Sequence, residues 1–487
     1  MTTRTSSHLL ALFASLLCLS PPAASVEVLA IDGVRIIDTL AGRASAPRCL
    51  RIAGRIVEAT LPPGSDACRA NAVLVDGADL WALPGLIDMH VHHTLGPLVI
   101  DRGQGEVRLS AHPDDEIADF NGRRLIAFGV TTIRNPGGSL AAATRYEERR
   151  HLPGFVGPET HNAGPVINSQ PIAGLAVAAN TEEDILRIVA EQAAAGADWI
   201  KLYTGLSDEL VRAAIRGADA RGIPTVAHLD RLSWTDALEM GVDSLVHLMP
   251  ISPDLLAPEA RANYVSTARP GSFAFFEWWE HFDPDGPQAD RLVAAFNEHR
   301  PVFDATLVAF HAAFWQDLGS IHQRDAMRYA HPKLLANWNN WFTFTLGWQD
   351  EDFERARAVW PKVERLAVRL YGSNARTTIG SDTSNPWIAP GISLHREMQL
   401  LADAGVSAAT ILRAATANAA EALGAADRLG RIAAGYEADI VLLRGNPLTA
   451  IEHSLDIVGV VNNGRLIAEP EIAELKESDD VSPHDRL

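Results

Sequence analysis

The chain has little cysteine, more acidic than basic side chains and only one long apolar run. It contains three cysteines in 487 residues, and no two of them form a Cys-x-x-Cys pair, so a thiol redox motif is not indicated. Its formal charge of −19 makes nucleic acid an unexpected partner, because the electrostatic term in phosphate binding would have the wrong sign. Apolar residues make up 47% and charged residues 21% of the chain, which is the composition of a folded globular protein.

The one long apolar run lies at the N-terminus. Arg4 precedes an apolar segment at residues 9–19, and small residues follow at 21–25. This order is typical of a secretory signal peptide. An uncleaved anchor is the alternative, but the segment is too short to span about 30 Å of hydrocarbon. We therefore expect residues 1–25 to be a signal peptide, and a periplasmic or secreted protein without a membrane span.

Removal of the signal peptide would leave two cysteines, Cys49 and Cys68. In an oxidising compartment a disulfide between them would close a short loop and stabilise the fold by about 3 kcal/mol. Two buried free thiols are the alternative. We favour the disulfide.

Residues 83–92 have the pattern of an apolar strand that ends in two histidines, His90 and His92. Side chains alternate between the two faces of a strand, so both imidazoles face the same volume, while Met89 and Val91 face the other side. Each neutral imidazole offers a nitrogen lone pair to a divalent metal. The pair alone is weak evidence, because two polar residues at a strand end are common.

Four later segments repeat this design, since in each an apolar or β-branched run ends in one potential metal ligand. The ligands are Lys201, His228, His247 and Asp382. Helical patterns separate the strands, with a capping box at 181–184 that opens a helix to residue 195 and further helices at 207–222 and 234–241. Alternating strands and helices indicate parallel βαβ units. Ligands at successive strand ends indicate an α/β fold of the (β/α)8 TIM-barrel type, in which the ligands meet at one mouth.

The predicted barrel occupies residues 81–429, and the β-rich segments 26–80 and 430–470 are expected to pair into one composite β-sandwich domain. The eight barrel strands are expected to end at His92, at Arg134, within 156–167, at Lys201, at His228, at His247, within 301–307 and at Asp382. Aromatic-rich insertions lie at about 250–300 and 310–370. Most of their aromatic side chains are expected to pack onto the barrel, and others to form substrate walls. They include Trp278, Trp279, Trp315, Trp338, Trp341 and Trp348.

With these residues in place, the chain resembles the amidohydrolase superfamily, in particular a branch of prolidase-like dipeptide and N-acyl amino acid hydrolases with two metal ions. The resemblance extends from about residue 26 to residue 461. It depends most on the ordered set of six ligands, and it is supported by segments 129–134, 414–424 and 435–441. The chain differs at 162–168, where that branch tends to carry a glycine-histidine turn. The substrate is therefore less well indicated than the metal chemistry.

The resemblance implies that His90, His92 and Asp382 bind the more buried of two divalent ions, and that His228 and His247 bind the more exposed one. Lys201 would be an N6-carboxylysine whose CO2-derived carbamate bridges both ions. A free ammonium has no lone pair to donate and would be repelled by cations, whereas a carbamate is anionic and has two oxygens. An ordinary lysine paired with Asp198 or Glu209 is the alternative. The ligand types favour zinc, while manganese or cobalt would fit the same atoms.

The resemblance further implies an exported metal-dependent amidohydrolase that cleaves the amide or peptide C–N bond of a small substrate such as a dipeptide or an N-acyl amino acid. A metal-bridging hydroxide would attack the carbonyl, and Asp382 would carry the proton to the leaving group. Tyr203 lies two residues beyond Lys201 on the same strand face and is expected to bind the substrate. Packing at the barrel rim is the alternative for Tyr203.

Three further side chains are assigned structural roles. Arg134 is expected to form an ion pair beneath the site, and His395 to pack within a helix layer. His93 points away from His92 in a strand, and no chemistry is assigned to it.

Two alternative functions are kept. A mononuclear deaminase or cyclic-amide hydrolase of the same superfamily would use one ion, without Lys201 as a ligand. A catalytically inactive metal-binding or interaction protein belongs to a different class, and the presence of all six ligand positions argues against it. The sequence does not decide whether the chain forms a homo-oligomer.

Overall fold

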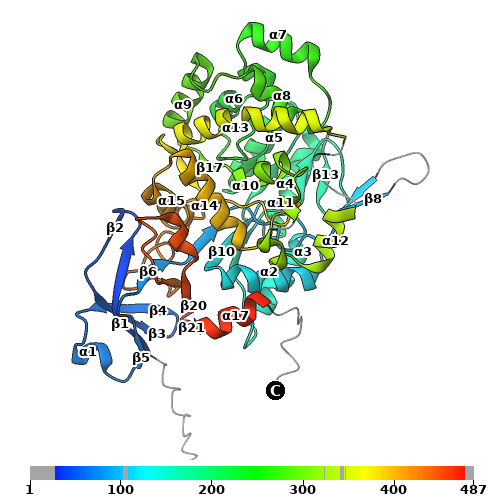
Figure 1. The fold of residues 1–487 in the computed structure, drawn as a ribbon. Coiled ribbons are helices and arrows are strands. Elements are labelled where there is room, and N and C mark those ends of the chain that lie inside the picture. Colours follow the sequence, from blue (N-terminus) through cyan, green and yellow to red (C-terminus); the bar gives the residue numbers. More distant parts are fainter. Residues whose placement is uncertain (1–27, 102–107, 323, 341–344, 346, 478–487) are drawn as a thin grey trace, which may run out of the picture.

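The computed structural model describes residues 28–101, 108–322, 324–340, 345 and 347–477 (Figure 1). The expected signal peptide and Trp341 lie outside the described residues. Within the described residues, no helix combines the length and the apolar content needed to cross a bilayer.

Strands from both ends of the chain share one nine-stranded sheet, seen at the lower left of Figure 1. Its order is β21 (Arg465–Ala468), β20 (Ile457–Asn462), β19 (Ile440–Leu443), β6 (Trp81–Pro84), β1 (Val28–Asp38), β3 (Arg48–Ala53) and β4 (Ile56–Leu61), with β2 (Arg43–Ala44) and β5 (Val73–Asp76) paired to β1. The ends meet where β19 pairs antiparallel with β6. Ile31, Leu50 and Leu442 share one buried apolar cluster, so the N-terminal and C-terminal segments share a core. Strands from the two chain ends therefore pair within one sheet.

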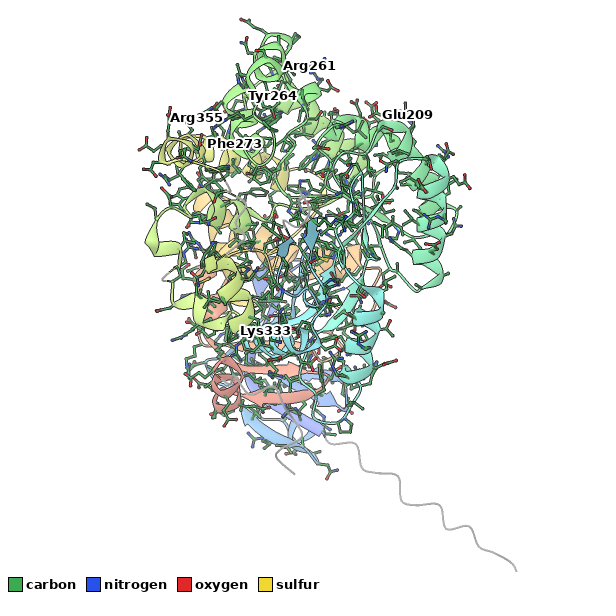
Figure 2. The ribbon with its side chains drawn as sticks, turned by 90° about the vertical axis from the view of Figure 1, so that its right-hand side faces the viewer. Glu209, Arg261, Tyr264, Phe273, Lys333 and Arg355 are labelled. Atoms are coloured by element: carbon green, nitrogen blue, oxygen red, sulfur yellow. A yellow bond between two sulfur atoms is a disulfide. The ribbon has the colours of Figure 1, made fainter. Side chains whose placement is uncertain are left out.

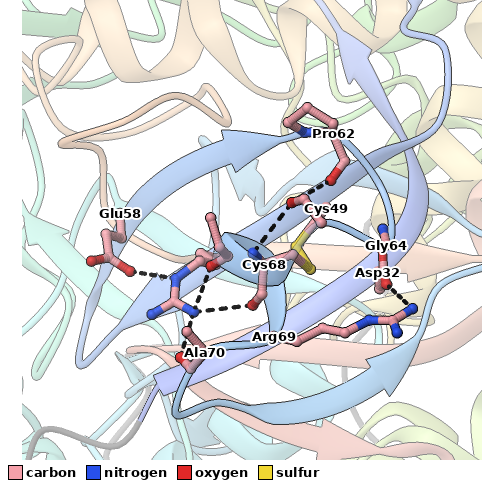
Figure 3. Close-up of a disulfide and its surroundings, with 11 residues drawn as sticks. Asp32, Cys49, Glu58, Pro62, Gly64, Cys68, Arg69 and Ala70 are labelled. Carbon is pink, nitrogen blue, oxygen red and sulfur yellow. Dashed lines mark hydrogen bonds and ion pairs between the residues drawn. A yellow bond between two sulfur atoms is a disulfide. The ribbon is translucent and has the colours of Figure 1, made fainter.

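The disulfide favoured from the sequence is also present. Cys49 on β3 and Cys68 on α1 (Asp66–Arg69) are bonded and fully buried (Figure 3). Beside them, Arg51 donates from Nη1 to the carbonyl oxygens of Cys68 (3.0 Å) and Ala70 (2.8 Å), which holds α1 against β3. Both cysteines therefore belong to a structural cross-link.

The central part of the chain contains two parallel sheets. One has the order β11 (Glu159–Asn162), β10 (Val130–Asn135), β7 (Leu86–Asp88). The other has the order β13 (Ala176–Ala178), β12 (Val166–Asn168), β14 (Ile200–Leu202), β15 (Thr225–Ala227), β16 (Ser244–Val246), β17 (Val302–Asp304), β18 (Arg376–Thr378). Adjacent strands within each of these two sheets pair in parallel.

Backbone hydrogen bonds join both edge strands of the three-stranded sheet to the seven-stranded sheet. The Met89 N–H, just beyond β7, donates to the carbonyl of Ile379 beyond β18 (2.8 Å). The Asp198 N–H, just before β14, donates to the carbonyl of Asn162 on β11 (2.8 Å). In the described chain, β7, β10, β11, β14, β15, β16, β17 and β18 therefore follow one another in a closed order. This is the strand order expected for a (β/α)8 barrel.

Helices alternate with these strands along the chain. They include α2 (Asp115–Ala127), α3 (Leu140–Arg150), α4 (Glu182–Ala194), α5 (Asp208–Asp219), α6 (Trp234–Met240), α14 (Ile392–Ala404), α15 (Ala408–Ala414) and α16 (Ala417–Ala422). The predicted cap of α4 is confirmed, because the Thr181 hydroxyl accepts the Asp184 N–H at 3.1 Å. The helix predicted at 234–241 ends at Gly241, whose φ of 98° fits a left-handed helix end.

The two insertions form helices above the strand ends. The first contains α7 (Pro258–Thr267), α8 (Ala274–His281) and α9 (Pro287–His299), and the second contains α10 (Leu307–Phe314), α11 (Gly319–His322), α12 (Pro332–Asn340) and α13 (Asp350–Tyr371). Figure 2 shows Tyr264, Phe273 and Arg355 together at the upper end of the molecule. Trp278 and Trp279 are fully buried and contact each other edge to face, with ring centroids 5.2 Å apart. The expected packing role is confirmed for these two tryptophans.

Candidate metal centre

A cavity of about 120 Å³ lies at the carboxyl-terminal ends of the parallel strands. All six predicted ligands line it. His90 and His92 follow β7, Lys201 lies on β14, and His228, His247 and Asp382 follow β15, β16 and β18. The residues that the sequence placed at successive strand ends therefore do converge on one volume.

Two of these side chains are carried by an unusual backbone. His247 and Asp382 both have a φ of 62°, in the left-handed region that non-glycine residues rarely occupy. Each is held there by its neighbour strand, since the His247 N–H donates to the Asp304 carbonyl (2.9 Å) and the Asp382 N–H to the His90 carbonyl (2.8 Å). Such strain at the ends of two strands is typical of functional sites.

The ligand atoms lie close enough to share cations. His90 Nε2 is 3.5 Å and His92 Nε2 is 3.7 Å from Asp382 Oδ1. Ligand atoms of His90, His247 and Asp382 all lie within 4.8 Å of one another. His228 extends this group, because its ring centroid lies 4.6 Å from that of His247.

Four buried polar atoms in this group are suitable ligands for the metal ions that the resemblance implies. His90 Nε2, Lys201 Nζ, His228 Nδ1 and Asp382 Oδ1 have no hydrogen-bond partner in the described part of the chain. A buried polar atom without a partner is costly, and coordination of a divalent cation would remove that cost. The donor set of imidazole nitrogens and carboxylate oxygen is suitable for zinc.

Burial keeps the four imidazoles in the metal-binding form. It lowers the pKa of His92 to about 4 and that of His228 to about 3, and it holds the pKa values of His90 and His247 well below the usual range. The histidines are therefore neutral near pH 7 and have a free lone pair.

Lys201 contributes a buried amine to the cavity. This burial lowers its pKa to about 7, although Asp304 acts to raise it. The neutral amine is the form that can add CO2. The alternative ion pairs are not formed: Asp198 is exposed and accepts the Asn162 N–H (2.7 Å), and Glu209 is exposed on the outer helix α5 (Figure 2).

Asp304, at the end of β17, is a site residue that the sequence reasoning missed. It is fully buried, and its Oδ1 lies 2.9 Å from His90 Nδ1 while its Oδ2 accepts from Arg134 Nη2 (2.6 Å). The carboxylate thus directs His90 Nε2 into the cavity, as outer partners of ligand histidines do. Its signal was present, since Asp304 also ends an apolar strand. The expected structural ion pair of Arg134 is confirmed.

Other ligand histidines are oriented in the same way. His92 Nδ1 lies 2.8 Å from the Gly137 carbonyl, and His247 Nδ1 lies 2.8 Å from Thr306 Oγ1. His395 has the packing role expected of it, with ring nitrogens 2.8 Å from Ser454 Oγ and 2.9 Å from the Phe128 carbonyl.

Asp304→Asn is expected to weaken metal binding by about 10–100-fold, the usual effect of losing an outer partner of a ligand histidine. It should also destabilise the fold by about 3–5 kcal/mol, because Arg134 would stay buried without an anionic partner. Metal titration and chemical unfolding measure the two effects. Asp290→Asn, in an exposed ion pair with Arg369, is the matched control. Unchanged metal affinity in Asp304→Asn would show that Asp304 does not position His90.

Tyr203 lines the cavity, as predicted for a substrate-binding residue. Its ring stands edge to face against His228, with centroids 4.8 Å apart. Burial, assisted by Asp382, raises the pKa of its hydroxyl to about 12. The hydroxyl therefore stays protonated and can donate a hydrogen bond to a carbonyl oxygen.

Comparisons with known proteins agree with this geometry. A family model described as the amidohydrolase family matches residues 359–467. Uncharacterized proteins of Mycobacterium tuberculosis and Mycobacterium bovis are 30% identical over 207 residues, which is 39% of this chain and 52% of theirs. The chain therefore spans about half the length of the curated relatives it matches.

Several solved structures share the fold. Bottromycin amidohydrolase has a TM-score of 0.66 at 24% identity, with 93% of this chain and 89% of that chain covered. A Xaa-Pro dipeptidase with bound methionine has a TM-score of 0.65 at 19% identity, covering 91% and 100%. Ochratoxinase from A. niger has a TM-score of 0.63 at 18% identity, covering 94% and 99%. The family match over residues 359–467 and the shared fold support a relationship between the chain and the amidohydrolase superfamily.

Proposed function

We propose that the chain is a metal-dependent hydrolase that cleaves a carbon–nitrogen bond of a small molecule, in a (β/α)8 barrel. The observation that carries the proposal is the convergence of six potential ligands from five strand ends on one cavity. The family match supports the reaction class, since amidohydrolases act on such bonds. Dipeptides and N-acyl amino acids, expected from the sequence, belong in the first substrate panel.

In this proposal His90, His92 and Asp382 would hold one divalent ion and His228 and His247 would hold the other, and Lys201 would serve as a further ligand in the form of a carbamate. The structure supports this set through the buried, unpartnered ligand atoms. When bound, the ions would supply Lewis acidity and would lower the pKa of a coordinated water. Zinc is the proposed metal.

Two side chains of the protein transfer the proton and bind the carbonyl oxygen of the substrate. Asp382 accepts a proton from the attacking water and then donates it to the departing amine, since these two steps are successive. Its Oδ1 has no other hydrogen-bond partner in the described residues that would compete for the proton. Tyr203 donates a hydrogen bond to the carbonyl oxygen, whose negative charge grows during attack.

A mononuclear enzyme of the deaminase type is the second candidate. Ligand atoms of His90, His247 and Asp382 lie within 4.8 Å of one another, so these three side chains alone could hold one ion. Lys201 would then act as an amine in the cavity wall. Counting the bound ions distinguishes the two candidates.

The test is a metal-loaded assay. Protein reconstituted with zinc and bicarbonate is incubated with dipeptides, N-acyl amino acids, cyclic amides and neutral amides, and release of the amine is measured. We expect hydrolysis of at least one amide, loss of activity on chelation and recovery when zinc is returned. A protein that binds zinc but hydrolyses none of these compounds, and no ester or lactone in an extended panel, would instead support the inactive binding protein.

We also propose that the protein is exported to an oxidising compartment. The Cys49–Cys68 disulfide supports this, because such bonds persist mainly outside the cytosol. N-terminal sequencing of protein from the periplasm or the medium should find a start near residue 26. Recovery only from the cytosol, with an intact N-terminus, would contradict export.

A further inference from the structure

The walls of the cavity that face the candidate metal centre are apolar. The segment from the start of β12 to the start of β13 contributes Val166, Ile172, Leu175 and Ala176. The two insertions contribute one phenyl ring each, Phe275 from α8 and Phe310 from α10. Three segments that are far apart in the sequence thus line the cavity with apolar side chains.

The wall formed by residues 166–176 is fixed by its backbone. The Val166 N–H donates to the Leu175 carbonyl (2.9 Å), and the Ala111 N–H donates to the Ala173 carbonyl (2.8 Å). Gly174 has a φ of +86°, and a Cβ at this position would lie 2.4 Å from the Ala111 oxygen. Only glycine fits there, so the loop is held closely against β9 (Arg108–Ser110) and its apolar side chains have a defined place.

The two phenyl rings lie on the side of His247. Their planes are nearly perpendicular, with centroids 5.6 Å apart, and the Phe310 ring lies 6.2 Å from the His247 ring. Rings in this arrangement favour contact with another flat apolar group. The cavity of about 120 Å³ is close to the roughly 150 Å³ of an apolar cavity that binds benzene.

Charged partners for a substrate are scarce. Among the described residues that line the cavity, Lys201 is the one cation, and it belongs to the candidate metal centre. Beyond the six ligands, the polar side chains are Tyr203 and Asn385, and Asn385 Nδ2 already donates to the Asp382 carbonyl (3.0 Å). At the apolar walls, away from the candidate metal centre and Tyr203, a carboxylate would have no charged or donor partner among the described lining residues and would be destabilised. The chain charge of −19 adds to the repulsion of anions.

We propose that the substrate of this enzyme is an uncharged amide, in which a single small ring or branched alkyl group beside the scissile bond occupies the apolar cavity. This inference rests on the proposed hydrolysis of a C–N bond. It replaces dipeptides and N-acyl amino acids, which carry a free carboxylate, by neutral N-aryl or N-alkyl amides as the substrate class. The ring lies against Phe275 and Phe310, and the carbonyl oxygen lies toward Tyr203.

Two compounds of nearly equal size test the charge requirement. 4-Acetamidobenzamide is neutral, and 4-acetamidobenzoate carries a carboxylate at the same position. With zinc-loaded protein we expect the neutral compound to have a kcat/KM at least about tenfold higher, because the carboxylate must be desolvated without a partner. Calorimetric binding of both compounds gives a second readout that does not depend on turnover.

Two variants test whether the preference for the neutral compound comes from the apolar walls of the cavity. Leu175→Arg adds a cation to a half-buried wall position and should reverse the preference toward the carboxylate, whereas Leu152→Arg, at an exposed leucine outside the cavity, should not. Phe275→Ala should weaken binding of the neutral compound by about tenfold, since it removes one ring contact.

The possible outcomes distinguish failure of the inferred substrate class from failure of the proposed hydrolase function. Preference for the neutral compound, reversed in Leu175→Arg, supports the inference. Equal or better hydrolysis of the carboxylate overturns it while the proposed function stands. If neither compound is hydrolysed but the neutral one binds and Phe275→Ala weakens it, the ligand class holds and the hydrolase proposal fails. Absence of binding by either compound overturns the inference.

Discussion

Asp382→Asn is expected to retain most of the bound metal and to lower kcat by about 10²–10⁴-fold, the contribution of a positioned acid–base group. Asparagine keeps an oxygen at the position 3.5 Å from His90 Nε2, so one ligand atom is preserved. Its amide cannot accept the proton of the attacking water at neutral pH. The turnover should therefore fall while the metal content stays nearly constant.

Steady-state kinetics and elemental analysis on the same samples check this result. Asp403→Asn, at an exposed position near the end of α14, is the matched control and should keep full activity. A fully active Asp382→Asn would remove the proton shuttle from the mechanism. Loss of the metal together with the activity would restrict Asp382 to the role of a ligand.

Lys201→Ala is expected to lower metal affinity by more than about 100-fold. Losing an outer partner of a ligand costs up to about 100-fold, and in the proposed centre a bridging ligand itself would be lost. Activity should fall with the bound metal. Lys201 has no structural ion pair with Asp198 or Glu209 in the described structure, so the fold should tolerate alanine. Thermal unfolding of the metal-free variant, close to that of the metal-free wild type, would verify this.

Two measurements separate the carbamate from a simple amine. Reconstitution of the wild type should depend on bicarbonate, and acetate should restore part of the activity of Lys201→Ala by placing a carboxylate in the same space. Lys333→Ala, at an exposed lysine on α12 (Figure 2), is the control and should bind metal normally. A Lys201→Ala protein with full metal content and activity would favour the mononuclear candidate.

The strand ends and their ligands could be predicted because both signals are local. His90 and His92 stand two residues apart after an apolar run, and Lys201, His228 and Asp382 end similar runs. Side chains alternate between the two faces of a strand, so the position of each residue in the strand determines which way its side chain points. The cap at Thr181 is local in the same sense, and helix α4 begins where it predicts.

The orientation of the ligands and the cavity walls could not be predicted, because they depend on contacts between distant segments. Asp304 acts on His90, 214 residues earlier, and pairs with Arg134, 170 residues earlier. The wall around Gly174 has its shape because the chain near Ala111 pairs with it. Neither contact leaves a periodic pattern in the sequence.

The most direct test of the central claim is the number of metal ions bound per chain. Elemental analysis of protein reconstituted with zinc and bicarbonate, then freed of excess metal, gives this number. Two ions per chain are predicted for the six-ligand centre. No bound zinc would contradict the metal site itself, and a single ion unaffected by Lys201→Ala would contradict the bridged pair.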